Sequence, residues 1–406
     1  MSSPLPENPS ALPSTQQRDT GRKLVLDTIR DHGEIARIDI ARAIDASPAT
    51  VTVIVAELLE AGLISEVAKE SSGQRGRPRI KLRISNEAHK IAGIKVSRNL
   101  VSVVITDFGG EEITRYEHIL EFAKMSASQL CQEILCALDL ACGKGGFPRE
   151  EISSIGIGLA GQIDSRRNFV HWSSSLNIRN VALGDVLYNE AKIPVFIDND
   201  ANLVARAEQL FGKGKNIDNF VVITIEHGVG MGIVIDHQLY RGARGCGAEF
   251  GHTKVQLEGA LCQCGQRGCL EAYVGDYALL REAIIRQDDD SPQSLDSLFQ
   301  AAEHGDDLAR AIFTRAGRMF AMGLANVINV FDPKLIILSG SRLSKNFLYT
   351  ESVLDHVQRS VVQVDEPLPE IITHAWGDMM WEKGAAAYGI EGISNLCINE
   401  LSAHVD

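Results

Sequence analysis

The stretch from Gly251 to Tyr273, GHTKVQLEGALCQCGQRGCLEAY, contains one histidine and three of the eight cysteines of the chain. His252 and the thiols of Cys262, Cys264 and Cys269 form a complete set of tetrahedral zinc ligands. The alternative is that these cysteines are reduced and pack in a core as small apolar side chains. A loop rich in Gln, Arg and Gly is poor composition for a core, so we expect a metal site.

Four protein ligands would leave no open coordination position on the ion, so the expected zinc is structural and not hydrolytic. We expect it to hold His252 and the zinc loop, residues 249–271, against a binding cleft. The other cysteines follow no ligand pattern and are expected to be structural; they are Cys131, Cys136, Cys142, Cys246 and Cys397.

The whole chain has the composition of a soluble globular protein. Its 406 residues, 45% hydrophobic and 23% charged, are enough for two or three domains. No apolar run reaches the roughly 18 residues that a membrane span needs. Residues 1–19 are polar and rich in Pro and Ser, which favours a disordered tail over a signal peptide. The cytoplasm is the expected compartment, since the cysteines show no disulfide spacing.

Charge is distributed unevenly along the chain. The net charge is −13, which argues against a protein that coats nucleic acid over its whole surface. Residues 20–85 carry 11 Lys/Arg and 9 Asp/Glu, however, so that this segment is weakly basic and the remainder strongly acidic. Such asymmetry is typical of a nucleic-acid-binding module attached to an acidic body.

Residues 20–62 predict three short helices. Leu24, Leu26 and Ile29 are expected on the buried side of the first helix. Ser47 is a good N-cap, and Pro48 suits the first position of the third helix, where its missing N–H costs nothing. The buried stripe of that helix would be Val51, Ile54, Val55 and Leu58, and the outward side chains near its start would be Ala49, Thr50, Thr52 and Val53.

These helices have the pattern of a helix-turn-helix, in which short side chains let the second helix of the motif enter a DNA major groove. We therefore expect Ser47, Pro48, Ala49, Thr50 and Thr52 to contact DNA. A small bundle of three ordinary helices would fit the same pattern. Related winged helices often carry a serine cap at the position of Ala36. The alanine therefore predicts a frayed start for the first DNA-facing helix.

A basic wing after these helices shifts the balance toward DNA binding. Residues 63–84 alternate like a β-hairpin, and the tip reads GQRGRPR. Arg75, Arg77 and Arg79 in this tip are typical of a minor-groove insert, although a basic loop alone is usually a solvated surface. Together, the patterns predict a winged helix-turn-helix domain over residues 20–85.

Residues 88–406 alternate between strands and helices and predict an α/β fold. A hairpin of two strands followed by β–α units occurs near residues 91–195 and again near 219–340. The repetition suggests two related lobes with a cleft between them.

The chain is identified by its motifs as resembling the ROK family (repressors, open reading frames, sugar kinases), specifically its transcription regulators. The resemblance covers nearly everything from about residue 20 onward. It rests on GAEFGHTKV…CQCGQRGCLEAYVG, IDNDANLVARAE, GIGLAGQID and the winged helix with RGRP. It implies a two-lobed actin-like domain of the sugar-kinase, ribonuclease-H-like type, with a sugar cleft between the lobes. The cysteines and histidine of the zinc loop match the family's pattern ligand for ligand.

The resemblance also implies a set of sugar-binding residues, because carboxylates and amides pair well with vicinal hydroxyls. The matching positions are Gly161, Ser174, Asn199, Asp200, Glu249, His252 and Glu271. In kinases of the family the counterpart of Asp200 is the base that removes a proton from the sugar hydroxyl. From the sequence alone, the Asn199–Asp200 pair after a strand would be read as a helix cap.

The turns that hold ATP in such kinases are altered in this chain. A turn of the D-x-G-G-T type is replaced by Lys95-Val96-Ser97-Arg98-Asn99, which lacks the metal-anchoring Asp and the glycine pair. In the second turn His227 stands where a phosphate-contacting Thr is expected. Kinase activity is therefore expected to be absent or vestigial, with Asp200 a vestigial base.

The sequence predicts a sugar-responsive regulator, most simply a repressor of carbohydrate uptake or catabolism genes. Its partners would be double-stranded operator DNA, a sugar or sugar-phosphate effector and a second copy of the chain in a dimer or tetramer. One alternative is a sugar kinase with an attached DNA-binding domain. Another is a signalling adaptor that binds a sugar-transport protein.

Overall fold

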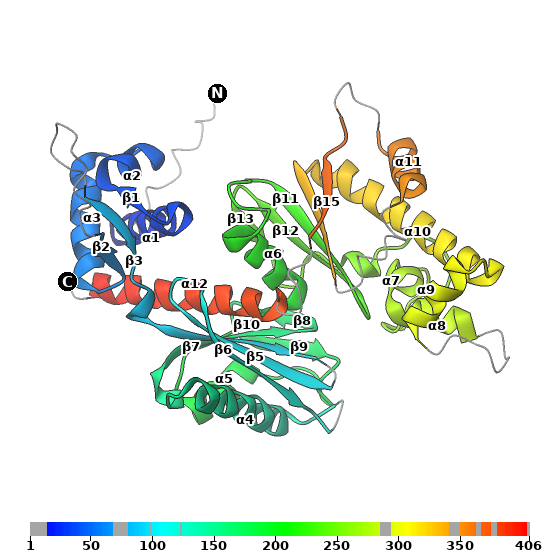
Figure 1. The fold of residues 1–406 in the computed structure, drawn as a ribbon, viewed down its shortest axis with the longest axis horizontal. Helices are drawn as coiled ribbons and strands as arrows, with labels where there is room; N and C mark the ends of the chain where they lie inside the picture. The colour runs from blue at the N-terminus through cyan, green and yellow to red at the C-terminus, as the bar shows by residue number, and fades with distance from the viewer. Residues whose placement is uncertain are drawn as a thin grey trace, which may run out of the picture.

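The computed structural model describes residues 14–67, 80–97, 99–121, 124–284, 294–340, 350–362, 367–374 and 380–403. Three bodies follow one another along the chain, and the C-terminal helix lies between the first two of them (Figure 1). We call them the head, the first lobe and the second lobe.

The head is a small helical domain with a three-stranded sheet. Its elements are α1 (Ser14–His32), β1 (Ile35–Ala36), α2 (Arg37–Ala43), α3 (Pro48–Glu60), β2 (Ile64–Glu66) and β3 (Lys81–Ile84). The strand order β1-β3-β2 places β3 in the middle, antiparallel to both neighbours. This is the winged helix-turn-helix arrangement that the sequence predicted. The tip of the wing, with Arg75, Arg77 and Arg79, lies outside the described residues.

Two details of the first helix differ from the sequence prediction. Helix α1 begins at Ser14 and so includes residues that we expected in the tail. Asp19 accepts a hydrogen bond from Ser402, and Arg18 forms an ion pair with Glu57, which gives this extra turn tertiary partners. Leu24, which we expected on the buried side, is 46% exposed. Val25 lies in the core in place of Leu24, together with Leu26 and Ile29.

The first lobe is a five-stranded mixed sheet with helices on both faces. The strands are β4 (Lys90–Val96), β5 (Leu100–Asp107), β6 (Glu112–Ile119), β7 (Ile152–Leu159) and β10 (Val195–Asn199), in the order β10-β7-β4-β5-β6. A separate hairpin pairs β8 (Gly161–Asp164) with β9 (Phe169–Ser173). The helices are η1 (Asn86–Ala88), α4 (Ala127–Gly145), η2 (Arg149–Glu151), α5 (Leu183–Ala191) and α6 (Asp200–Phe211).

The second lobe repeats this topology. Its strands are β11 (Phe220–Ile225), β12 (Val229–Ile235), β13 (Gln238–Tyr240), β14 (Leu335–Ser339) and β15 (Glu370–Thr373). Their order, β13-β12-β11-β14-β15, is that of the first sheet when the strands are numbered within each lobe. The prediction of two related lobes is confirmed. The repeat runs on past residue 340, because α11 (Glu351–Ser360) precedes the last strand.

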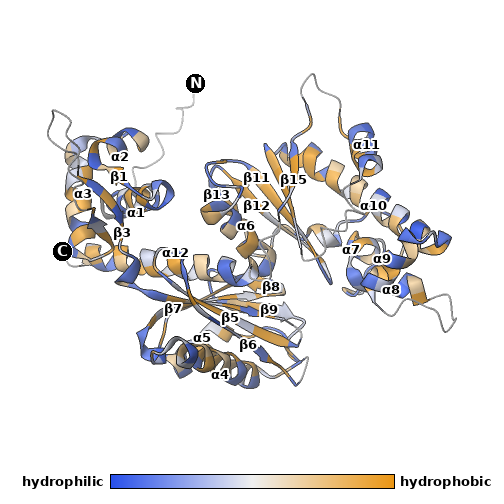
Figure 2. Cartoon of the chain, in the orientation of Figure 1, coloured by the Kyte–Doolittle hydropathy of each residue, from blue (hydrophilic) through white to orange (hydrophobic). Residues whose placement is uncertain are grey.

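Helices cover the second sheet and carry the zinc loop at one end of the lobe. They are η3 (Phe250–His252), α7 (Glu271–Val274), α8 (Asp276–Ala283), α9 (Leu295–Glu303) and α10 (Asp307–Phe331). The central strand β11 is buried along its whole length and most of β12 is buried, which agrees with their largely apolar side chains (Figure 2).

The last helix, α12 (Met380–Ala403), returns to the first lobe and lies across its sheet. Two glycines make this close approach possible. A Cβ on Gly93 would lie 2.1 Å from the carbonyl oxygen of Glu382, and one on Gly156 would lie 1.8 Å from that of Ala385. The far end of α12 contacts α1 of the head (Figure 1). The helix therefore touches both the head and the body, by which we mean the two lobes together.

Candidate functional sites

The start of α3 is an exposed, well-capped helix end. Ser47 is the N-cap: its Oγ accepts a hydrogen bond from the Thr50 backbone N–H at 3.1 Å, and Pro48 follows at the first helical position. The Thr52 hydroxyl donates to the Pro48 carbonyl at 2.7 Å. All of the residues 47–50, 52 and 53 are exposed, while the predicted stripe Val51, Ile54, Val55 and Leu58 is buried.

The first helix of the helix-turn-helix, α2, is short and lacks a side-chain cap. Ala36 occupies the N-cap position of α2 and makes no cap hydrogen bond, as its methyl side chain requires. The helix is nevertheless formed over Arg37–Ala43, since Ile40 and Ala41 pack into the core of the head. Tertiary packing thus compensates for the missing cap at this position.

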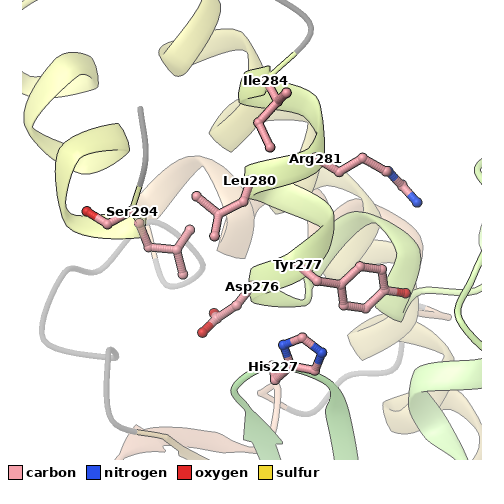
Figure 3. A pocket seen from close by; sticks show the side chains of 8 residues that line it. His227, Asp276, Tyr277, Leu280, Arg281, Ile284 and Ser294 are labelled. Atoms are coloured by element: carbon pink, nitrogen blue, oxygen red, sulfur yellow. The ribbon is translucent and has the colours of Figure 1, made fainter. Parts of the chain in front are cut away.

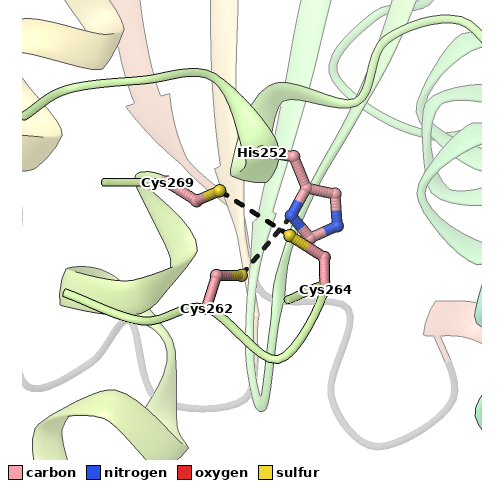
Figure 4. A group of neighbouring side chains, drawn as sticks. All are labelled: His252, Cys262, Cys264 and Cys269. Carbon is pink, nitrogen blue, oxygen red and sulfur yellow. Dashed lines mark hydrogen bonds between the residues drawn. The ribbon is translucent and has the colours of Figure 1, made fainter. Parts of the chain in front are cut away.

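The zinc loop brings its four predicted ligands together. The donor atoms of His252, Cys262, Cys264 and Cys269 all lie within 4.8 Å of one another. Nδ1 of His252 is 3.7 Å from Sγ of Cys262, and the Sγ atoms of Cys264 and Cys269 are 3.8 Å apart (Figure 4). Sulfur atoms at about 2.3 Å from a tetrahedral zinc ion are separated by roughly 3.8 Å, so the set has the spacing that such an ion requires.

His252 presents its two ring nitrogens to different neighbours. Nδ1 faces Cys262, whereas Nε2 is 3.9 Å from Oε2 of Glu249. A metal ion held at Nδ1 would leave the proton on Nε2, where it can be donated to a ligand in the cleft. One ring can therefore serve both the metal and the sugar, as the two sequence predictions for His252 require.

Three predicted sugar-binding carboxylates converge beside this loop. Burial raises the pKa of Glu249, and the neighbouring charges of Asp200 and Glu271 raise it further, while His252 lowers it. Burial also raises the pKa of Asp200, with Lys95 acting in the opposite direction. Glu271 is held in place because its Oε2 accepts a hydrogen bond from the Val229 N–H at 3.3 Å.

Asn199 connects this cluster to the Gly161 turn. Its Nδ2 donates to the Gly161 carbonyl at 2.9 Å, while its Oδ1 caps α6 by accepting from the Ala201 N–H at 2.9 Å. The capping interpretation of Asn199 is thus confirmed, and it fixes the amide beside the Gly161 turn. Ser174 is half-buried beyond the end of β9, and none of the described hydrogen bonds joins it to the carboxylates.

Sequence reasoning missed the residue that organises the strand end before Asn199. Asp198 is fully buried and accepts hydrogen bonds from Nε of Arg241 at 2.7 Å and from Nδ2 of Asn202 at 2.9 Å. Arg241 comes from the segment after β13, so this ion pair joins the two lobes. The acidic residue inside the IDNDAN motif was the available signal.

The turn that we expected to lack the metal-anchoring Asp of related kinases begins with a cation, Lys95. Lys95, at the end of β4, lies with its ammonium group 4.2 Å from the centre of the Trp381 ring. Its charge also acts on Asp200 and on Glu382 of α12.

His227 lies at the exposed turn between β11 and β12. Its ring is 5.4 Å from that of Tyr277, and it borders a cavity of about 580 Å³ (Figure 3). Asp276, Leu280 and Leu295 also line the cavity.

Glu382 offers a test of the charge balance beside Lys95. Its side chain is buried, one of its oxygens has no hydrogen-bond partner among the described residues, and burial raises its pKa. The folded protein therefore retains a proton at pH values where the unfolded chain has lost it, so stability falls as the pH rises through that interval. Glu382→Gln should remove this pH dependence and stabilise the protein at neutral pH. Urea unfolding at several pH values measures the free energy of unfolding. If this free energy changes with pH in the variant as it does in the wild-type protein, the prediction is contradicted.

Comparisons with known proteins agree with the geometry. The ROK family profile matches residues 112–390, and the MarR family profile matches residues 22–73. The DNA-binding transcriptional repressor Mlc of Escherichia coli is 32% identical over 338 residues, which cover 81% of this chain and 82% of Mlc. A xylose repressor of Caldicellulosiruptor bescii is 28% identical over 364 residues, covering 86% of this chain and 90% of the repressor.

Solved structures show the same relationship. A ROK family transcriptional regulator, described as a homologue of the E. coli Mlc protein, aligns over 96% of this chain and 99% of its own, with a TM-score of 0.81 and 26% identity. A ROK glucokinase of Streptomyces griseus in complex with glucose and AMPPNP aligns over 75% of this chain and all of its own, with a TM-score of 0.63 and 27% identity. The chain belongs to the ROK family, with a MarR-type winged helix at its N-terminal side.

None of the helices in the described part of the chain has the length and apolar character that a bilayer crossing requires.

Proposed function

We propose that this protein is a sugar-responsive transcriptional repressor whose winged-helix head binds operator DNA and whose cleft binds the controlling sugar. The observation that carries the proposal is the joint presence of two sites in one chain. One is the exposed, capped start of α3. The other is the carboxylate cluster of Asp200, Glu249 and Glu271 beside the zinc loop. The names of the related repressors support the same function.

In the head, the side chains proposed to face DNA are Ser47, Pro48, Ala49, Thr50 and Thr52, with Arg75, Arg77 and Arg79 of the wing. The Ser47 and Thr52 hydroxyls are engaged with the local backbone, so methyl groups and small side chains dominate the outward surface. Such a surface suits close approach to a major groove and contact with thymine methyl groups. One head reads a half-site, which favours a homodimer on a palindromic operator.

In the body, we propose that Asn199, Asp200, Glu249, His252 and Glu271 bind the sugar hydroxyls, with minor contributions from Gly161 and Ser174. Zinc held by His252, Cys262, Cys264 and Cys269 would stabilise the loop and fix the orientation of the His252 ring. Its chemistry there would be structural, since the four protein ligands complete a tetrahedron. We further propose that the effector is a sugar or a sugar phosphate and that a sugar-transport protein is a partner of this domain.

The second candidate is a sugar kinase, favoured by the structural match to the glucokinase and by the retained Asp200. Lys95 at the metal-anchoring position and His227 in the second phosphate turn argue against it. We therefore propose that the chain is not an enzyme. We also propose that it acts in the cytoplasm.

Selection of duplexes from a random DNA library by the zinc-loaded protein tests the DNA-binding part. The expected result is enrichment of one palindromic sequence with two half-sites. A library that stays random after several rounds would contradict the proposal.

A further inference from the structure

Helix α12 contacts the head, the sheet of the first lobe and helix α6. It packs on β4 and β7 of the first lobe, on α6, and on α1 of the head. Near its C-terminal end, the fully buried Arg22 of α1 donates to Ser402 of α12 and, through Nε at 2.8 Å, to Glu57 of α3. The position of α12 thus bears directly on the helix proposed to read DNA.

Glu391, in the middle of α12, binds the head and the body at the same time. Its Oε1 accepts a hydrogen bond from Nζ of Lys23 in α1 at 3.1 Å. Its Oε2 pairs with Nη2 of Arg206 in α6 at 2.8 Å. The side chains of Glu391 and Arg206 are only 20% and 12% exposed, so solvent screens this pairing little.

The surrounding charges keep Glu391 ionised. Burial alone would raise the pKa of this carboxyl, but Arg206 and Lys23 together hold it below its ordinary value. Burial raises the pKa of Asp27 in α1, and the same two cations, Lys23 and Arg206, act to lower it. The junction between head and body is therefore a cluster of alternating charges, in which the loss of one member leaves a poorly solvated partner.

Arg206 connects this charge cluster with the proposed sugar site through helix α6. It lies in α6, the helix that begins at Asp200, about two turns away. Helix α6 packs on β11 and β12 of the second lobe as well as on α12, so a change in the angle between the lobes must shift it. The Arg241–Asp198 pair supports the same connection, because the Arg241 guanidinium also lies 5.3 Å from the centre of the Tyr388 ring in α12.

We propose that Glu391 couples occupancy of the sugar cleft to the placement of the head, by pairing with Arg206 of α6 and Lys23 of α1 simultaneously. The inference rests on the proposed function, since it presumes that the cleft binds a sugar and the head binds DNA. A sugar that changes the angle between the lobes displaces Arg206, and the shared carboxylate transmits that displacement to α1. Buried ion pairs suit such a switch, because they are either formed or broken.

The test uses the full-length, zinc-loaded protein and two variants, Glu391→Gln and Lys23→Gln. D-glucose, D-xylose and N-acetyl-D-glucosamine are the probe sugars, with binding measured by calorimetry. Affinity for a duplex selected from a random library is measured by fluorescence anisotropy with and without the sugar that binds. Allosteric effects of this kind typically change affinity by about 5- to 150-fold. Both variants should bind the sugar with wild-type affinity, while the sugar's effect on DNA binding falls by about threefold or more.

Glu400→Gln is the matched control, since it removes an exposed carboxylate from the same helix. It should keep the full response. In the double variant, the sugar should change DNA affinity by as much as it does in either single variant. The reason is that both substitutions break the same connection. Lys23→Gln leaves the Glu391–Arg206 pair intact, so it remains informative if Glu391→Gln fails to fold. A wild-type response in Lys23→Gln would overturn the coupling. A wild-type protein that binds none of the sugars, or no DNA, would instead overturn the proposed function.

Discussion

Val53→Glu is expected to weaken specific DNA binding by about 10- to 100-fold, because it places a carboxylate on the outward face of α3 next to the DNA phosphates. Val53 is 54% exposed and follows directly after Thr52, so the substitution alters the surface without disturbing the buried stripe of the helix. The measurement is fluorescence anisotropy on the selected duplex at fixed salt concentration, with thermal unfolding to show that the head is intact.

The control for this experiment is Leu140→Glu in α4 of the first lobe. Leu140 is also an exposed apolar side chain in a helix, at 42% exposure, and the substitution adds the same charge. It should change DNA affinity little, because the effect of an exposed charge is screened beyond about 10 Å at ordinary salt. Equal loss of affinity in both variants would indicate a general effect of net charge and would remove the argument for α3.

Cys264→Ser is expected to release the metal ion and destabilise the second lobe. Residues 263–267 of the zinc loop are exposed, and structural zinc supplies much of the folding free energy of such segments. A loss of about 4 kcal/mol would lower the Tm by roughly 8–16 °C. Wild-type protein should contain one zinc ion per chain by elemental analysis, and the variant should contain far less.

Cys264 suits this test because its side chain is exposed, so that serine costs little packing. Cys136→Ser, an exposed cysteine in α4, is the matched control and should retain both zinc and the wild-type Tm. A Cys264→Ser protein with full zinc content would mean that the cluster is not the metal site. Unchanged sugar binding after metal loss would argue against the proposed role of zinc in orienting His252.

Much of the architecture could be predicted because the relevant signals are local. The alternation of strands and helices in each lobe, the Ser47-Pro48 cap and the stripe Val51 to Leu58 are set by neighbouring residues. The zinc ligands were also predictable, since three of them lie within eight residues of one another and the fourth just upstream. The structure places all four together.

Other features depend on contacts between distant segments and left no periodic signal. The return of α12 to the first lobe, the placement of β15 beside β14, and the pairing of Asp198 with Arg241 all join residues far apart in sequence. Leu24 had the right spacing for the core, but Val25 is the residue that packs there. Asn199 could be read as a cap or as a ligand, and its hydrogen bonds show that it caps α6 and joins it to the Gly161 turn.

The central claim, that a sugar in the cleft controls DNA binding without being phosphorylated, is tested most directly by one titration. The zinc-loaded protein bound to its selected duplex is titrated with D-glucose, D-xylose or N-acetyl-D-glucosamine in the presence of ATP and Mg²⁺. Anisotropy and ADP release are followed together. We expect one of the sugars to lower the anisotropy and no ADP to form. Sugar-dependent release of ADP with unchanged anisotropy would contradict it and would make the chain a kinase.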